Sequence, residues 1–481
     1  MTNDEAQISD MLRRLWRRRA SVLAANVAVA AREHREIAHA ATLIGEDYHE
    51  RFVVELIQNA NDQALRGGLH DSTVLVVRTE HYVAVSNGGQ AVTEGNLERI
   101  SSLADSDKTG LLVGNKGVGF KAVYQVTDEP EVYSAPDDEV DTSVFDRLAV
   151  GFALERQPFE HAPLAQAVEQ DVRAFFAEND GLARSLAEVG HEDPVAAVRP
   201  EFAKVAGFKF PLPRTAEDLA RRVDELRVPS ELRAGVRTLV VLPLRDDKAG
   251  ATAQKVIDRL VTAQDGAPAQ GELAALFLDG VGQIVVIDHV RGKRWSFSCQ
   301  SSLDTDAAKH VTVDVHEGGV EQKRTHYWMI RTDVFDCDER TAAERRALVD
   351  RALKRFGLEA WSTDDPLAVT VALPKPRAGV VGALGSAGRF CLGLPTEQST
   401  GLPAHVDARF FAKINRDGVI FDEQEGYNEL LLDVATSAFG ALLTRLRASD
   451  AIDDRRAATL ALHRPPGAPG PLADRVYGDG G

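Results

Sequence analysis

The chain has 481 residues, of which 44% are hydrophobic and 27% are charged, and its formal net charge is −17. This length exceeds what a single hydrophobic core supports, so it predicts a soluble globular protein of two or three domains. The negative charge argues against nonspecific attraction to nucleic acid or to anionic membranes as its main property.

The cysteines and the apolar runs bear on the compartment. Cys299, Cys337 and Cys391 lie far apart without paired spacing, which favours a reducing cytoplasm over a disulfide framework or a zinc site. No apolar run is long enough to cross a bilayer. Residues 12–31 resemble the basic and apolar regions of a signal peptide, but acidic residues precede them and a helical pattern follows. We therefore expect a retained helix.

Hydrophobic periodicity and turn residues predict a mixed α+β chain. In the first half we expect helices at about 5–45, 48–65 and 93–104, a Val-rich hairpin at 73–89, a flexible run at 105–114, a glycine turn and helix at 115–126, and strands at 129–135 and 237–245. In the second half we expect helices at 255–264, 272–281 and 426–448, and strands at 282–290, 310–317, 323–335 and 367–375.

These elements suggest four regions along the chain. We predict an N-terminal helical segment over 1–45, a first domain over 46–245, a second α/β domain over 246–445, and a tail over 446–481. The tail contains HRPPGAPGP and is expected to be flexible because proline and glycine dominate it.

A polar stripe on the predicted helix ELIQNANDQA is the first candidate site. Glu55, Asn59 and Asp62 are spaced i, i+4 and i+7, so they share one helical face. An asparagine side-chain oxygen is a hard ligand suited to Mg²⁺. A glutamate one turn earlier can orient or deprotonate a water molecule that attacks a terminal phosphate. Singly, each residue would be read as part of a solvated helix face.

Two glycine turns complete this pattern. The strand VAVSN ends at Asn87 and is followed by Gly88 and Gly89, and GNKGVGFK, residues 114–121, precedes a helix. Glycine lets the backbone approach an anion, and the N–H groups and dipole of the helix that follows favour negative charge. Lys116 and Lys121 would add positive charge where phosphates lie.

Together these segments resemble the GHKL ATPase family. ELIQNANDQA is similar to its N-box, SNGGQAVT to its adenine-binding Asp-x-Gly-x-Gly turn, and GNKGVGFKAVYQVTDEPEVYS to its glycine-rich lid box, most closely in the sacsin N-terminal-like subgroup. The later segments TLVVLPL and LPTEQSTGLPAHVDARFF also resemble that subgroup. The resemblance implies a Bergerat-type α/β sandwich that binds ATP and Mg²⁺, followed by a second α/β domain of the transducer or middle type.

By position, the resemblance also implies roles for individual residues. Glu55 matches the general base, Asn59 the Mg²⁺ ligand and Asp62 a residue lining the nucleotide pocket. The residues that match the glycine-rich phosphate box are Gly114, Lys116, Gly117, Val118, Gly119, Phe120 and Lys121.

At the base-binding turn this chain departs from the family. Asn87 stands where an aspartate usually accepts a hydrogen bond from the adenine amino group, and an uncharged amide oxygen can still accept that bond. Gly89 keeps the first turn glycine, while Ala91 replaces the second. Thr238, on the strand RTLVVLPL, matches a threonine near the adenine.

The family also has a mobile lid and a basic residue from the second domain. Leu103 to Gly114 matches the lid, and its sequence ADSDKTG suits a segment that closes over nucleotide. Lys413 and Arg416, in the loop FFAKINRDG, are candidates for contacting the γ-phosphate, beside the alternative of a solvated basic loop.

The leading interpretation is therefore a Mg²⁺-dependent ATPase in which nucleotide drives closure between domains or protomers. A chaperone-like or defence and stress role, a client or partner protein and a homodimer are expectations by analogy. One alternative is a DNA-acting ATPase of the topoisomerase or mismatch-repair type, for which the chain offers a basic run, Arg13, Arg14, Arg17, Arg18 and Arg19. Others are a sensor histidine kinase, with His34 as the nearby histidine, and a nucleotide-binding scaffold without hydrolysis.

Overall fold

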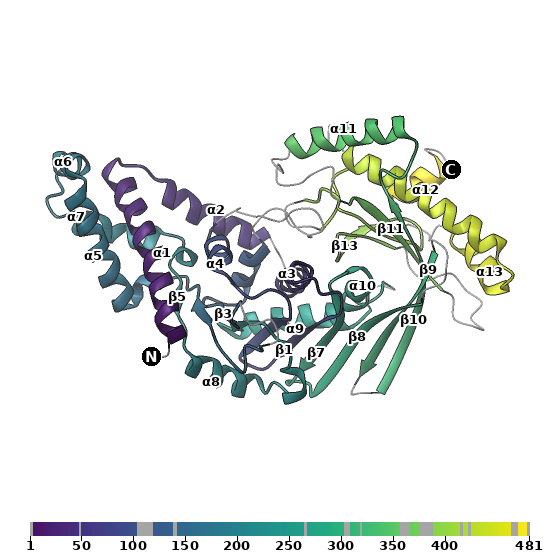
Figure 1. The fold of residues 1–481 in the computed structure, drawn as a ribbon, viewed down its shortest axis with the longest axis horizontal. Coiled ribbons are helices and arrows are strands. Elements are labelled where there is room, and N and C mark those ends of the chain that lie inside the picture. Colours follow the sequence, from purple (N-terminus) through teal and green to yellow (C-terminus); the bar gives the residue numbers. More distant parts are fainter. Residues whose placement is uncertain are drawn as a thin grey trace.

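The structure is a computed structural model in which both termini lie at opposite ends of an elongated molecule (Figure 1). The residues that it describes are 3–47, 50–102, 119–137, 142–263, 267–302, 308–317, 320–355, 366–375, 388–413, 417–421, 425–462 and 470–478. The predicted mixed α+β class is confirmed, since helices and strands alternate along the chain.

The helices gather at the two ends of the molecule and over the sheet. The α-helices are α1 (Asn3–Ala28), α2 (Glu33–Asp47), α3 (Phe52–Arg66), α4 (Glu94–Ile100), α5 (Ala162–Glu178), α6 (Asp180–Glu188), α7 (Pro194–Val198), α8 (Ala216–Leu226), α9 (Asp247–Val261), α10 (Gln270–Phe277), α11 (Glu339–Arg355), α12 (Tyr427–Ala448), α13 (Ile452–Leu460) and α14 (Pro471–Tyr477). Short 3-10 helices include η1 (Gly119–Gln125). In the described part of the chain, no helix is both long and apolar enough to cross a membrane.

The described strands form one continuous ladder of 14 strands in the order β13-β12-β14-β11-β10-β9-β8-β7-β1-β2-β6-β3-β4-β5. They are β1 (Ser72–Arg78), β2 (Tyr82–Asn87), β3 (Glu131–Ser134), β4 (Val150–Ala153), β5 (Leu212–Pro213), β6 (Thr238–Pro243), β7 (Val281–Asp288), β8 (Lys293–Ser302), β9 (Ala308–Glu317), β10 (Val320–Asp333), β11 (Ala368–Pro374), β12 (Arg389–Cys391), β13 (Pro395–Ser399) and β14 (His405–Asp407). The parallel pairing of β1 with β7 joins the two halves of the chain.

The first hydrophobic core extends beyond the predicted boundary at residue 245. It combines α3, β1 and β2 with α9, α10, β7 and part of β8, including buried Phe52, Ile257 and Phe297. A second core lies between β10, β11 and α12, around Phe390 and Phe439. The halves therefore meet through a shared core and a shared sheet.

The N-terminal helix is broken earlier than the sequence predicts. The expected helix over 5–45 divides into α1 and α2 at residues 29–32, and α2 continues through Gly45. Ala30 adopts a left-handed φ of 54°, and the N–H of Ala31 donates to the carbonyl of Asn26 at 2.8 Å, which is a Schellman-type ending. Such an ending usually carries glycine, so an alanine there leaves no signal in the sequence.

The prediction of a flexible tail over 446–481 is wrong for the described residues 446–462 and 470–478. These residues form the end of α12, α13 and α14, and Leu472 and Ala473 are fully buried in the second core. The N–H of Ala473 donates to the carbonyl of Thr400 at 3.1 Å. Two apolar residues are enough to hold this short segment against the second core, and the composition of the segment does not reveal that this core is there to bind it.

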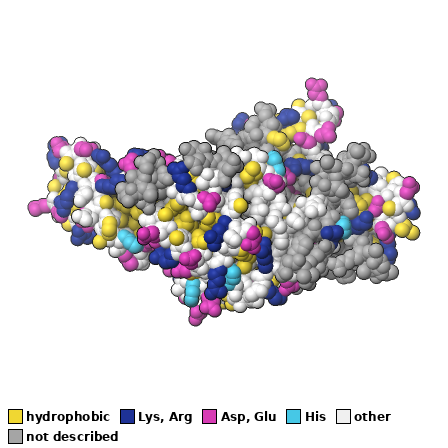
Figure 2. All heavy atoms as spheres, turned by 60° about the horizontal axis from the view of Figure 1, so that its bottom comes forward, with side chains coloured by type: hydrophobic (Ala, Val, Ile, Leu, Met, Phe, Trp, Pro, Cys, Tyr) yellow, Lys and Arg dark blue, Asp and Glu magenta, His cyan; other side chains and the backbone are white. Residues whose placement is uncertain are grey.

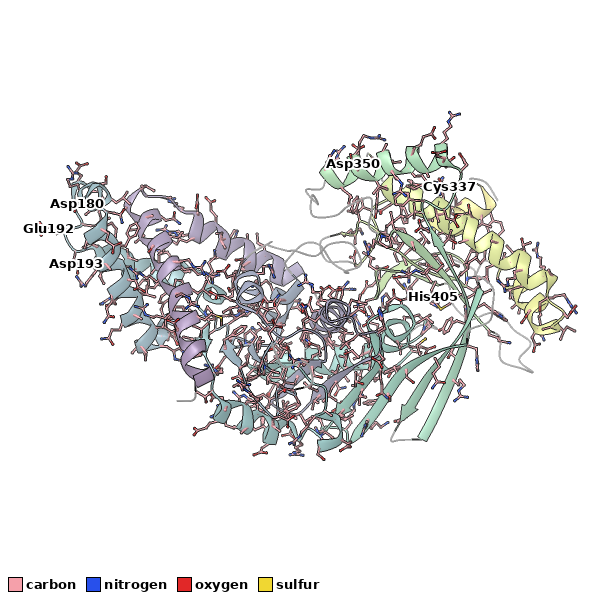
Figure 3. All side chains as sticks on the ribbon, viewed as in Figure 1. Asp180, Glu192, Asp193, Cys337, Asp350 and His405 are labelled. Carbon is pink, nitrogen blue, oxygen red and sulfur yellow. The ribbon has the colours of Figure 1, made fainter. Side chains whose placement is uncertain are left out.

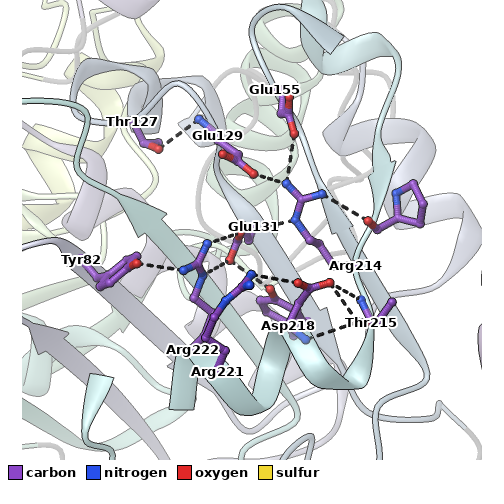
Figure 4. A network of polar contacts seen from close by, with 12 residues as sticks. Tyr82, Thr127, Glu129, Glu131, Glu155, Arg214, Thr215, Asp218, Arg221 and Arg222 are labelled. Atoms are coloured by element: carbon purple, nitrogen blue, oxygen red, sulfur yellow. Dashed lines mark hydrogen bonds and ion pairs between the residues drawn. The ribbon is translucent and has the colours of Figure 1, made fainter. Parts of the chain in front are cut away.

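A buried charged network holds α8 against β3 (Figure 4). Glu131 is fully buried on β3, and both its carboxylate oxygens accept from the guanidinium of Arg222 on α8, at 2.7 and 2.8 Å. Tyr133 donates its hydroxyl to the same carboxylate at 3.0 Å. Because the ion pair is bidentate and shielded from water, each charge depends on the other.

We predict that Glu131→Ala destabilises the protein by about 3–5 kcal/mol, because it leaves Arg222 buried without its main partner. The matched control is Glu225→Ala, which removes the other carboxylate on Arg222, 2.8 Å away and 35% exposed. The control should lose no more than about 1 kcal/mol. Urea unfolding of both variants measures this difference, and equal losses would contradict it.

Candidate functional site

Helix α3 carries the predicted polar stripe along one edge of the first core. Phe52, Ile57 and Ala60 are buried in that core, which holds the apolar face of the helix in place. On the polar face Glu55 is 2% exposed and Asp62 is fully buried, while Asn59 is half-buried. A stripe of carboxylates and an amide buried to this extent is not a solvated helix face.

Glu55 lies against the end of the glycine-rich segment. Helix η1 begins at Gly119 and packs on α3. A Cβ atom added at Gly119 would overlap Oε2 of Glu55, so with any other residue the Glu55 carboxylate would have to shift. The structure therefore brings the polar stripe and the glycine segment together. The helix after this turn is a 3-10 helix over 119–125 instead of the expected α-helix.

Much of the predicted phosphate box lies outside the described residues. Gly114, Lys116, Gly117 and Val118 fall there, as does the lid predicted over 103–114. The described part of the box consists of Gly119, Phe120 and Lys121.

Lys121 differs from its expected role as a phosphate ligand. Its side chain is 2% exposed, and its ammonium donates to the carbonyl of Ile100 at the end of α4 and stacks 3.7 Å from the ring centre of Phe208. Burial, with Arg19 and Lys209 nearby, lowers its pKa well below the usual range. The ammonium thus supports α4 in this structure, and the expectation that it adds charge beside phosphates is corrected.

The turn after β2 forms a second wall of the site. A Cβ at Gly89 would overlap the backbone of Gln63 and Ala64, so this glycine allows the turn to lie directly on α3. The N–H of Gln90 donates to the carbonyl of Gln63 at 3.0 Å. The end of β2 is thereby fixed beside the last turns of α3. Ala91, which replaces the second glycine, is buried.

Asn87 and Thr238 are neighbours across the sheet. They lie directly opposite each other in the antiparallel pair β2–β6. The carbonyl of Asn87 accepts from the N–H of Arg237 at 2.7 Å. On its other side Thr238 faces Ser134 of β3, with 3.1 Å between the two hydroxyl oxygens. Sequence reasoning missed Ser134, although its position at the end of a strand, like that of Asn87, was a usable signal.

Lys413 and Arg416 are not brought to α3 by any described contact. The ammonium of Lys413 is 3.5 Å from the carboxylate of Asp417, and the backbone N–H of Lys413 donates to the carbonyl of Gly418 at 3.0 Å. These contacts lie within its own loop, and Arg416 lies outside the described residues. Their proposed contact with a γ-phosphate stays a prediction.

Two further polar residues of α3, missed by sequence reasoning, contact the second half of the chain. Gln58 donates from Nε2 to the carbonyl of Leu392 at 3.3 Å, between β12 and β13. Asn61 accepts at Oδ1 from the N–H of Gly280 at 2.9 Å, just before β7. Their i, i+3 spacing places them on one face of the helix. Helix α3 therefore joins the candidate site on one face to the second half on another.

The turn that contacts Gln58 is held by Asp407 of β14. The carboxylate of Asp407 accepts from the N–H of Gly393 at 2.6 Å. Burial raises the pKa of Asp407 to about 7, and Asp279 adds to the rise, while this hydrogen bond and Arg331 oppose it. His405 lies beside this region in the second half (Figure 3). It is 2% exposed, and burial lowers its pKa to about 3, so it is neutral above that pH.

We predict that the titration of Asp407 lowers the free energy of unfolding between about pH 4 and pH 7. Its pKa is raised in the folded state, so the folded chain holds the proton more tightly and this stabilisation is lost as the pH rises through about 7. Asp407→Asn keeps an acceptor for Gly393 but does not ionise, so its loss over this range should be smaller. Urea unfolding at both pH values measures the difference, and parallel losses would contradict it. His405 is present in both proteins, so the difference between them reports Asp407.

Arginines of the basic run on α1 form ion pairs and hydrogen bonds with other parts of the molecule. Arg13 pairs with Asp171 of α5, Arg18 with Glu98 of α4, and Arg19 donates to the carbonyl of Lys209. On the face shown in Figure 2, lysine and arginine side chains alternate with acidic ones and form no extended basic field among the described residues. These pairs weaken the DNA-acting alternative, because phosphate binding would have to compete with them.

His34 does not have the setting of a phosphoacceptor. Its side chain is 7% exposed, and its Nε2 lies 3.0 Å from a carboxylate oxygen of Glu201. A phosphoacceptor histidine must reach a nucleotide bound elsewhere, so this burial disfavours the histidine-kinase alternative.

Comparison with known proteins adds one local similarity. No family model matches the chain. Over 94 residues the chain is 31% identical to Protein NO VEIN of Arabidopsis thaliana; this stretch is 19% of the chain and 3% of that plant protein. The chain thus spans a very small part of the length of the curated relative that it matches.

Proposed function

We propose that the chain is a Mg²⁺-dependent ATPase of the Bergerat type, with its nucleotide site on the polar face of α3. The observation that carries the proposal is the close approach of Glu55 to Gly119, which sets a buried carboxylate beside the last glycine of the segment that the sequence predicts to bind phosphate. The local similarity to Protein NO VEIN and the three ordered motifs support the same family.

In this proposal Glu55 acts on the attacking water. A carboxylate held by its helix and packed against a glycine can accept a proton from a water molecule aimed at the terminal phosphate. Its position in the first turn of α3 also gives it a favourable interaction with the helix dipole. Because the helix is fixed in the core, the carboxylate is preorganised for this task.

Asn59 is proposed to bind the magnesium ion. Its half-buried side chain offers an amide oxygen one turn beyond Glu55, a donor type that suits Mg²⁺. When bound, Mg²⁺ neutralises charge on the phosphates. The described residues hold no group of three or more His, Cys, Asp and Glu that could bind a metal. A site completed by phosphates and water needs no such group.

Asp62, Asn87 and Thr238 are proposed to line the nucleoside end of the site. Gly89 ties the end of β2 to α3, so Asn87 and Asp62 belong to adjoining walls. Through Gln58 and Asn61, a change at α3 would be transmitted to the second half of the chain. A nucleotide-driven closure that acts on a client protein, in a chaperone-like, defence or stress role, a homodimer and a cytoplasmic location extend the proposal by analogy.

We predict that Glu55→Gln retains ATP binding but reduces turnover at least 100-fold, because glutamine keeps the shape and loses the base. Mg²⁺-dependent phosphate release and displacement of a fluorescent nucleotide measure the two properties. Glu98→Gln makes the same chemical change on α4, where the side chain is 40% exposed, and should leave both properties intact.

We predict that Asn59→Ala loses both Mg²⁺-dependent binding and turnover, because it removes the metal ligand from α3. Stabilisation against thermal unfolding by Mg²⁺ and ATP checks binding independently of turnover. Equal activity of the native chain, Glu55→Gln and Asn59→Ala would overturn the assigned roles. Binding without hydrolysis by the native chain would favour the scaffold alternative.

A further inference from the structure

The turn after β2 is bordered by buried polar atoms that lack partners. Oδ1 of Asn87, Oγ of Ser72 and Oε1 of Gln63 are buried and have no hydrogen-bond partner among the described residues. Ser72 Oγ lies close to Gly88, and the backbone of Gln63 packs on Gly89. Burying an acceptor without a partner is destabilising, so several such atoms around one turn point to a ligand that supplies the missing hydrogen bonds.

The side chain at position 87 determines which purine bases can form the missing hydrogen bonds. A carboxylate only accepts hydrogen bonds, so it favours a 6-amino group and repels a 6-oxo oxygen in the same position. An amide carries both an acceptor and a donor, which exchange places when the group turns about its last torsion. Asn87 can therefore accept from the amino group of adenine or donate to the oxo group of hypoxanthine.

The described neighbours do not fix which way the amide of Asn87 faces. The hydrogen bond from the N–H of Arg237 goes to the backbone carbonyl of Asn87, not to its side chain. Across the sheet, the hydroxyl of Thr238 is within 3.1 Å of the hydroxyl of Ser134, so it already has a partner. The N–H of Val92 also binds Ser134, at 2.8 Å. These contacts fix the backbone at residue 87, whereas the orientation of the Asn87 side-chain amide would be set by the bound base.

We propose that this base site accepts 6-oxopurine as well as 6-aminopurine nucleoside triphosphates, and that Asn87 is the residue that sets this tolerance. The inference rests on the proposed nucleotide site and adds the range of bases that it takes. Exclusion of 6-oxopurines would then require a single change, Asn87→Asp, which converts a two-way hydrogen-bonding group into an acceptor that carries charge.

The test compares ATP with inosine triphosphate, which differs from it at position 6 and the adjoining N1. Affinities are measured with Mg²⁺ by competition against a fluorescent ATP analogue, and turnover by phosphate release. For the native chain we expect affinities for the two nucleotides within about tenfold of each other, as one neutral hydrogen bond is worth about 0.5–1.5 kcal/mol. Asn87→Asp should change the affinity for ATP by no more than a few-fold and should lower the affinity for inosine triphosphate at least 100-fold relative to that for ATP.

The matched control is Asn179→Asp, which makes the same change at the junction of α5 and α6 and should leave the ratio unaltered. A native chain that binds ATP but rejects inosine triphosphate by 100-fold would overturn the inference and leave the ATPase proposal standing. Retention of inosine triphosphate by Asn87→Asp would also overturn it. Failure of the native chain to bind either nucleotide would remove both proposals. The native ratio does not depend on whether any variant folds.

Discussion

The close packing of α3 between two glycine-containing segments is the constraint on which the site depends. Gly89 meets the backbone of α3 near its end, and Gly119 meets the Glu55 side chain near its start. A methyl group at position 89 would force the turn away from the helix backbone, and one at position 119 would displace the Glu55 carboxylate. The polar face of α3, with Glu55 and Asp62 buried, is consequently bordered by both segments.

The same helix links the site to the rest of the molecule. Its apolar face lies in a core shared with α9, α10 and β7, and Gln58 and Asn61 contact the segments before β13 and β7. The sheet continues through the β1–β7 pair, so the second half is attached through both strands and side chains. A change in the position of α3 therefore has several physical routes to the second half, whereas a simple linker would offer none.

Buried charge is used in this protein mainly to hold elements together. Glu131 with Arg222 joins β3 to α8, and Arg78 with Asp288 joins β1 to β7 at 3.1 Å. The arginines of α1 pair with acidic residues on α4 and α5. These pairs place acidic side chains beside the basic N-terminal run.

Local patterns in the amino-acid sequence were enough to predict the spacing of Glu55, Asn59 and Asp62 on one helix, the end of β2 at Asn87, and the mixed α+β class. These follow from helical and strand periodicity, which short segments carry on their own. Other features of the fold became visible only in the tertiary structure, because most of them depend on contacts between residues distant in the sequence. In the folded chain Lys121 contacts Ile100 and Phe208, and Leu472 of the expected tail is buried in the second core. The first helix ends near Ala30, and the first core includes residues beyond 245. The turn at Ala30 is held by local hydrogen bonds without the glycine that would signal it, and the other outcomes depend on residues far away in the chain, whose positions no local pattern specifies.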